Sequence, residues 1–277
     1  MEYEVVFITL AVILGVYMTW GVGANDVANA MGTSVGSGAI TVRKAILIAA
    51  VFEFAGAFLA GGHVTGTIRK EIIDLSYVSD PQTMIYGFLA SLVAAGLWLM
   101  IASWIGWPVS TTHTIVGALI GFAVVGLDPQ AVEWQKVSGI VASWLISPLM
   151  GAAIAFTLTV SVRKLILDTD DPLAMAKRYG PFYVFFMGVL IALVTMFKGL
   201  KHLQLEFSGG QTLLLALAVG VVVAFFGKLM ISKVQADPTA ETSFQYASVE
   251  KVFAPLCVFT ACSMAFAHGS NDVANGI

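Results

Sequence analysis

The chain has 277 residues, of which 58% are hydrophobic and only 11% charged, with a formal net charge of −3. A soluble domain carries about 25% charged residues, so this composition excludes a soluble globular protein and predicts an integral membrane protein. No basic tract is present, and the charge gives no indication of nucleic-acid binding.

Eight apolar runs approach the roughly 20 residues that a helix needs to cross a bilayer. In chain order they lie near Val5–Trp20, Ala45–Gly62, Met84–Trp104, Pro108–Val125, Val137–Val160, Pro181–Phe197, Thr212–Ile231 and Val252–Ala267. They lack the alternation of β-barrel strands, so the sequence predicts an all-α fold, a polytopic membrane helical bundle. The fourth run, which opens with "PVSTTH", is either a crossing or half of a re-entrant hairpin.

The first and last runs continue into two copies of one polar motif, N-D-V-A-N, at residues 25–29 and 271–275. We expect these helices either to extend through the motif or to break at the neighbouring glycines. In the first copy Asn25, Asp26 and Asn29 fall on one side of a helix. Their oxygens are ligands that a sodium ion accepts, and their amides can donate to an anion. Acids inside a membrane are costly and usually functional, so the repeated motif predicts a binding site.

Two further segments carry polar groups in apolar surroundings. In "PVSTTH", the hydroxyls of Ser110, Thr111 and Thr112 lie at the expected start of a helix, where unpaired N–H groups and the helix dipole favour an anion. An ordinary helix cap would explain the same residues. Glu53 lies in the middle of the second run, where a lone carboxylate needs a cation, a proton or a hydrogen-bonding partner.

The distribution of lysine and arginine predicts the orientation. With eight crossings and the N-terminus outside, nine of these 14 residues lie on the cytoplasmic side and five outside; the opposite orientation reverses the ratio. The cytoplasmic residues are then Arg43, Lys44, Arg163, Lys164, Lys177, Arg178, Lys228, Lys233 and Lys251. The two motifs then enter the membrane with opposite polarity, which is typical of inverted repeats with a substrate site between them.

The segments "GANDVANA", "GSNDVANG", "FEFAGA" and "PVSTTH" together resemble the inorganic phosphate transporter (PiT) family, whose members move phosphate with sodium or protons. The resemblance runs along the whole chain. It implies inverted repeats, a moving transport part beside a scaffold, and a homodimer. It also implies that Ser110, Thr111 and Thr112 contact phosphate and that Glu53 is the acid used in coupling. The implied ligands of sodium and phosphate are the motif residues Asn25, Asp26, Asn29, Asn271, Asp272 and Asn275.

The predicted organisation has three parts. Residues 1–160 form the first repeat, residues 161–251 the connecting helices with a polar cytoplasmic linker, and residues 252–277 the start of the second repeat. The family carries a second "PVSTTH"-like segment, which on the spacing of the first repeat would lie beyond residue 277. We therefore expect the second repeat to be truncated.

The function expected from the sequence is sodium-coupled import of inorganic phosphate across the cell membrane, with no enzymatic activity and no cofactor besides the transported ions. Three alternatives stay open: proton coupling, because Asp26 and Glu53 can also take protons; a sulfate permease of the same family; and an anion channel.

Overall fold

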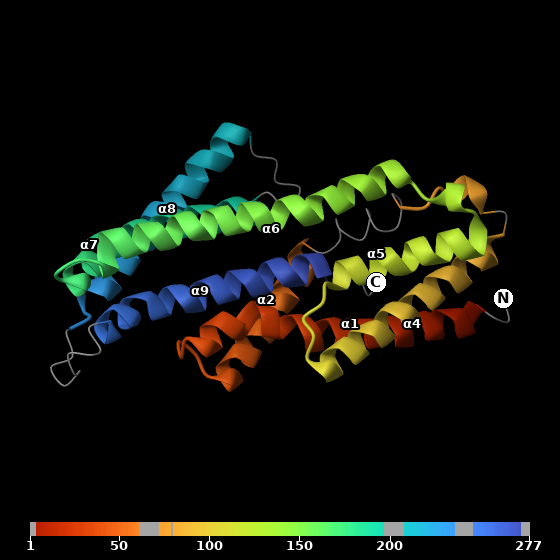
Figure 1. Cartoon of the computed structure of the whole chain (residues 1–277), viewed down its shortest axis with the longest axis horizontal. Helices are drawn as coiled ribbons and strands as arrows, with labels where there is room; N and C mark the ends of the chain where they lie inside the picture. The colour runs from red at the N-terminus through yellow and green to blue at the C-terminus, as the bar shows by residue number, and fades with distance from the viewer. Residues whose placement is uncertain (1–3, 61–71, 79, 197–207, 236–245, 273–277) are drawn as a thin grey trace. The chain divides into compact units, whose positions relative to one another are not determined.

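The computed structural model covers residues 1–277 and describes residues 4–60, 72–78, 80–196, 208–235 and 246–272. The described chain forms helices joined by turns and short loops, with one isolated bridge between Ile73 and Val132 (Figure 1). Its main helices are α1 (Glu4–Gly36), α2 (Val42–Ala60), α4 (Pro81–Ile105), α5 (Thr111–Phe122), α6 (Trp134–Val162), α7 (Pro172–Val194), α8 (Gly209–Ser232) and α9 (Ala247–Asp272). Short helical turns lie at Leu75–Tyr77, Ala123–Leu127, Pro129–Ala131 and Arg163–Leu167. Each predicted apolar run corresponds to one main helix, which confirms the all-α fold.

Six of the described helices are long and apolar enough to cross a membrane, namely α1, α4, α6, α7, α8 and α9. This confirms a multi-pass membrane protein. Helix α5 and the turn after it form a shorter apolar helix, Thr111–Leu127. At 1.5 Å per residue it reaches about 25 Å, less than the roughly 30 Å of a hydrocarbon core. The choice between a crossing and a re-entrant segment therefore stays a prediction.

Helix α1 runs unbroken through the first motif and its glycines. It packs closely on α4, where a Cβ at Gly21 would contact the side chain of Leu99 and a Cβ at Gly96 would overlap the ring of Tyr17. The glycines here permit close helix packing. For the first motif the longer helix is therefore the one observed, whereas residues 273–275 of the second motif lie outside the described residues.

The chain divides into two compact units. The first contains residues 1–33, 42–143 and 264–277, and the second contains residues 34–41 and 144–263. The division falls inside α1, α6 and α9. All the predicted site residues that the structure describes belong to the first unit. The repeat boundaries predicted from the sequence concern symmetry rather than compactness, and they stay a prediction.

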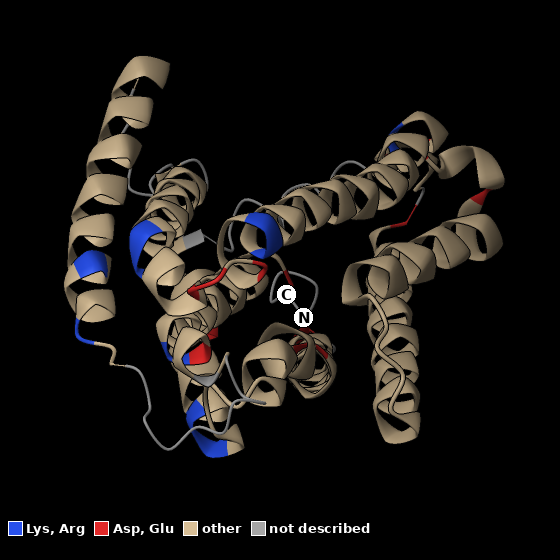
Figure 2. Cartoon of the chain, turned by 60° about the vertical axis from the view of Figure 1, so that its left-hand side comes forward, with Lys and Arg blue, Asp and Glu red and all other residues tan. Residues whose placement is uncertain are grey.

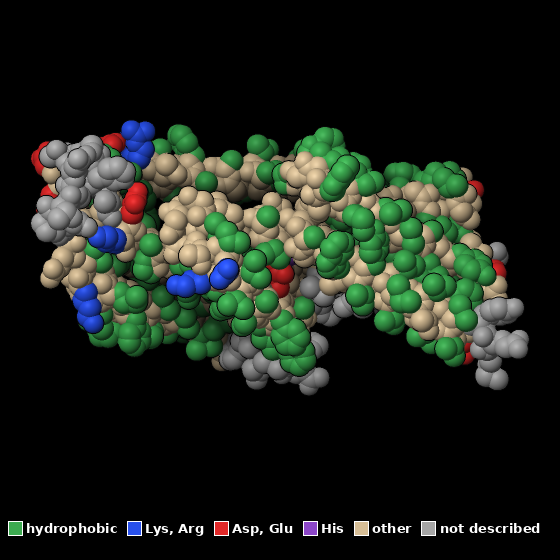
Figure 3. All heavy atoms as spheres, turned by 90° about the horizontal axis from the view of Figure 1, so that it is seen from below, with side chains coloured by type: hydrophobic (Ala, Val, Ile, Leu, Met, Phe, Trp, Pro, Cys, Tyr) green, Lys and Arg blue, Asp and Glu red, His purple; other side chains and the backbone are tan. Residues whose placement is uncertain are grey.

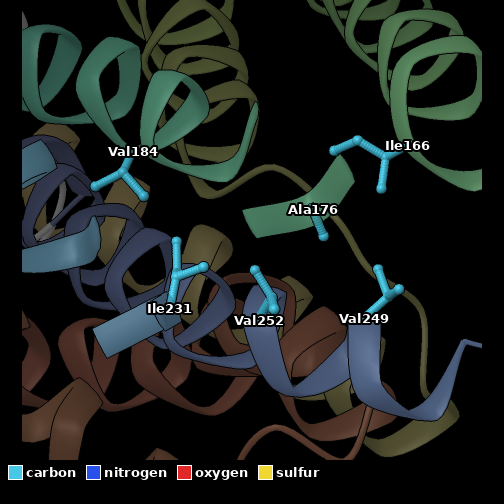
Figure 4. Packing of buried hydrophobic residues seen from close by; sticks show 6 residues of the cluster. All are labelled: Ile166, Ala176, Val184, Ile231, Val249 and Val252. Atoms are coloured by element: carbon cyan, nitrogen blue, oxygen red, sulfur yellow. The ribbon is translucent and has the colours of Figure 1, made fainter. Parts of the chain in front are cut away.

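The second unit is built around the hairpin of α7 and α8. Gly188 and Gly220 let the two backbones approach, since a Cβ on Gly188 would lie 3.2 Å from the Cα of Gly220. A hydrophobic cluster joins this hairpin to the part of α9 in the same unit (Figure 4). Its buried members are Ile166, Ala176, Val184, Ile231, Val249 and Val252.

Large apolar side chains cover much of the described surface. Leu149 and Phe156 on α6 are 70% and 71% exposed, and hydrophobic side chains are spread over the face seen in Figure 3. Long stretches of helix carry neither basic nor acidic residues (Figure 2). Such surfaces suit contact with lipid acyl chains, because soluble proteins rarely expose large apolar patches to water.

Candidate functional site

The first motif is tied to the turn between α4 and α5 by Asn25, whose residue surface is 6% exposed. Its Nδ2 donates to the hydroxyl of Ser103 at 3.2 Å and to the carbonyl of Trp107 at 3.0 Å. Its Oδ1 accepts from the backbone N–H of Val109 at 3.2 Å. The amide therefore uses both of its ends to fix the chain that leads into α5.

Local sequence explains that turn. Gly106 ends α4 with a φ of 78°, in the left-handed region that glycine adopts without strain. Trp107 then donates its N–H to the carbonyl of Ala102 at 2.8 Å, and its own carbonyl accepts from Asn25. Pro108 keeps the chain out of a helix just before α5 begins.

Helix α5 starts at the predicted hydroxyl segment. Ser110 is its N-cap, and its Oγ accepts from the N–H of His113 at 3.2 Å, so this residue does serve as a helix cap. The hydroxyls of Thr111 and Thr112 donate to Oδ1 of Asp272, at 3.1 and 3.0 Å. The hydroxyl segment and the acid of the second motif thus meet.

Asp26 is one of the most buried acids of the described chain, with a residue surface 7% exposed. Its Oδ1 accepts from Nδ2 of Asn29 at 3.3 Å, within the same motif. Its Oδ2 lies 3.2 Å from Nε2 of His268 on α9, but the two atoms form no aligned hydrogen bond.

His268 joins the acids of three helices. Its Nδ1 lies 3.1 Å from Oε1 of Glu53 on α2, and we assign the proton to Nδ1 because a carboxylate only accepts. Its Nε2 lies 3.2 Å from Asp26 and 3.3 Å from Oδ2 of Asp272. The exposed fractions of these four side chains are between 10% and 18%. The acids of both motifs and Glu53 therefore surround one imidazole.

Two glycines bring α2 and α9 together at this point. A Cβ on Gly269 would overlap the backbone of Glu53, and a Cβ on Gly56 would overlap the carbonyl of Phe266. With no side chain between them, the two backbones are in contact. This contact places Glu53 opposite His268.

The site has an excess of negative charge. Three carboxylates face at most one positive charge, that of the imidazole, in surroundings where charges are weakly screened. No three His, Cys, Asp or Glu side chains in the described ranges are arranged to hold one metal ion. The acids lie around the imidazole instead. Such a group attracts cations and, without them, repels anions.

The other predicted residues lie less centrally. Asn29 is exposed and bonds to Asp26. The Nδ2 of Asn271 donates along its own helix to the carbonyl of Ala267 at 2.9 Å. Asn275 lies outside the described residues.

Sequence reasoning missed His268 and the partners of Asn25. His268 precedes Asp272 by four residues and so shares its helix face. A titratable side chain in that position, beside an acid in an apolar run, is the signal that would have identified it. Ser103 and the backbone groups of the turn gave no such signal.

Comparisons with known proteins agree with these observations. A model of the phosphate transporter family matches residues 22–277. A candidate phosphate permease of Haemophilus influenzae is 46% identical over 278 residues, covering 100% of this chain and 66% of its own. One of Pyrococcus abyssi is 43% identical, covering 98% and 65%. A solved structure titled "The sodium-dependent phosphate transporter" has a TM-score of 0.86 and 37% identity, covering 98% of this chain and 65% of its own.

The chain therefore spans about two thirds of the length of these relatives. The match of the family model reaches from the first motif, in α1, through the second motif. The matched residues include His268 and the three acids around it, Asp26, Glu53 and Asp272. This chain belongs to the phosphate transporter family.

Proposed function

We propose that the protein containing this chain imports inorganic phosphate by sodium-coupled secondary transport with alternating access. The observation that carries the proposal is the buried group in which Asp26, Glu53 and Asp272 surround His268, while Asp272 also accepts from two hydroxyls at the start of α5. The solved structure with a TM-score of 0.86 is named as a sodium-dependent phosphate transporter, which supports the same ion and anion.

The charge of the site explains why cations are needed. Phosphate carries one to two negative charges at neutral pH, and the three carboxylates would repel it. Sodium ions held by Asp26 and Asp272 would offset that repulsion. The amide oxygens of the two motifs would complete their coordination. In this proposal the sodium ligands are Asn25, Asp26, Asn29, Asn271, Asp272 and Asn275.

The anion would bind at the start of α5, with Asn25 and Asn271 beside it. There the helix dipole and the first-turn N–H groups favour negative charge, and Ser110, Thr111 and Thr112 add hydroxyls. In the structure Thr111 and Thr112 donate to Asp272. A sodium ion would coordinate the carboxylate of Asp272 in place of the two hydroxyls. Both hydroxyls could then donate to phosphate. Ion and anion binding would thus depend on each other, which is the physical basis of coupling.

Uptake by the full-length protein in liposomes tests the proposal. We expect radiolabelled phosphate to accumulate under an inward sodium gradient and not under an equal choline gradient. Accumulation driven by a pH gradient without sodium would establish proton coupling instead. Complete inhibition of phosphate uptake by sulfate would indicate a sulfate permease instead. Currents far above transporter turnover would show a channel.

The resemblance to the family extends the proposal to the whole molecule. We propose inverted repeats, a homodimer, and insertion in the cell membrane with the N-terminus outside. Cross-linking in native membranes tests the homodimer, and thiol labelling of single cysteines near the starts of α1 and α9 tests the orientation and the inverted repeats.

A further inference from the structure

His268 has no counterpart in the first copy of the motif. When the two N-D-V-A-N copies are aligned, His268 matches Val22, four residues before each aspartate. Val22 is 2% exposed and belongs to the apolar core. The ring is therefore not required by the motif itself. One copy supplies a side chain that reaches the aspartate of both.

The two nitrogens of the ring are held differently. Nδ1 makes an aligned hydrogen bond to Glu53 at 3.1 Å. Nε2 lies 3.2 and 3.3 Å from Asp26 and Asp272, and among the described residues it completes no hydrogen bond. Glu53 thus anchors the ring, and the anchored ring directs Nε2 between two carboxylates.

The anchor itself is held by backbone packing. Gly56 and Gly269 leave no room for a side chain between α2 and α9. Glu53 and His268 consequently face each other from two backbones in contact. A ring held in this way can define where the neighbouring acids lie.

Asp26 and Asp272 both lie beside the His268 ring, and their charges make this contact important. Asp26 and Asp272 are both largely buried, and their carboxylates carry like charges that repel each other. Removing the group between them would leave buried charge without compensation, which is strongly destabilising. Side chains that orient the ligands of a metal ion change its affinity by about 10–100-fold when they are replaced.

We propose that His268 is a positioning residue for the cation site: anchored by Glu53, it sets the spacing of Asp26 and Asp272 and thereby the affinity for sodium. The inference rests on the proposed function. In it His268 contacts neither phosphate nor the bound ions, and it acts through the two aspartates.

The test compares His268→Val, the residue at the matching position of the first motif, with His268→Gln, which keeps a polar side chain able to hydrogen-bond to the neighbouring carboxylates. Full-length protein in liposomes gives the half-saturating sodium concentration and, at saturating sodium, the KM for phosphate. We expect the half-saturating sodium concentration of H268V to be about 10–100-fold higher than that of the wild type. We expect H268Q to restore most of that loss, with the phosphate KM little changed in both variants.

A second readout does not depend on transport. Sodium stabilises a protein that binds it only in the folded state, so the unfolding midpoint of purified protein is compared in sodium and in choline chloride. We expect the sodium-dependent rise to shrink in H268V and to return in H268Q. Thr260→Val, an exposed position on the same helix, is the matched control and should behave as wild type.

The outcomes separate the inference from the proposed function. Wild-type protein without sodium-driven phosphate uptake would refute the proposed function. Wild-type uptake together with an unchanged sodium requirement in folded H268V would overturn the positioning role. A change confined to the phosphate KM would also overturn it, because it would place His268 at the anion.

Discussion

Asp26 and Asp272 occupy matching positions in two copies of one motif, yet their neighbours differ. Asp26 accepts from an asparagine of its own motif, whereas Asp272 accepts from two threonine hydroxyls of α5. Both approach the same nitrogen of His268. We therefore expect the two acids to respond differently to substitution. Replacing Asp26 should affect sodium binding, whereas replacing Asp272 should affect the binding of both sodium and phosphate.

Replacing Asp26 with asparagine keeps the size of the side chain and removes its charge. We expect sodium-dependent phosphate uptake to fall to background in full-length protein that still inserts and elutes as a single species. Asp170→Asn, at an exposed position, is the matched control and should transport normally. Wild-type uptake and sodium dependence in D26N would show that this carboxylate holds no cation.

Replacing Thr111 with valine keeps the branched shape and removes a buried hydroxyl that donates to Asp272. Hydrogen bonds to charged groups contribute about 1.5–3 kcal/mol, so we expect the KM for phosphate to rise about tenfold or more. Thr114→Val is the control, because its hydroxyl only returns to the carbonyl of Ser110. Equal KM values in the two variants would leave the start of α5 as a helix cap.

At the scale of elements, the site depends on where α4 ends and on how closely α2 and α9 touch. The left-handed Gly106 ends α4 and lets Asn25 bind the turn before α5. Gly56 and Gly269 bring α2 against α9. Apolar length sets the helices themselves, while these few small residues set their distances.

The contact of α2 with α9 predicts the effect of Gly269→Ala. The added methyl group would overlap the backbone of Glu53, and overpacking of this kind costs about 1–3 kcal/mol. We expect a lower unfolding midpoint and a higher half-saturating sodium concentration. Gly139→Ala on α6 is the control, since nothing lies within 4 Å of its added Cβ, and alanine favours a helix by up to about 1 kcal/mol. A G269A protein as stable as G139A would mean that the helices separate freely.

At the scale of the whole molecule, every described site residue belongs to the first of the two compact units. The second unit contributes the α7–α8 hairpin and its apolar cluster. This division is compatible with the moving part and scaffold that the family resemblance implies, which stay a proposal. The orientation in the membrane is open to a direct experiment.

The basic residues predict that the N-terminus is outside and that the start of α9 is cytoplasmic. Single cysteines at Glu4 and at Glu250, both exposed, are introduced into full-length protein in which Cys257 and Cys262 are replaced. On intact cells an impermeant thiol reagent should label position 4, and should label position 250 only after the cells are opened. Labelling of both positions on intact cells would place an even number of crossings between them and argue against inverted repeats.

The helices and most of the polar residues at the site could be predicted from the sequence. A run of about 20 apolar residues has few alternatives in a bilayer, because its backbone must satisfy its own hydrogen bonds. For the same reason Asn25, Asp26, Glu53 and Asp272 stand out, since buried polar groups are costly. These residues can be recognised from the sequence because each is a polar residue within or next to an apolar run.

Which of these groups meet was decided only by the tertiary structure. His268 and Glu53 are 215 residues apart in the chain, and no periodicity relates them. Their contact depends on two glycines that let α2 and α9 touch, and the contact of Thr111 with Asp272 depends on how α5 begins beside α9. Helix formation is local and follows from each segment alone, whereas the distances between helices follow from side-chain packing, which the order of residues along one helix does not contain.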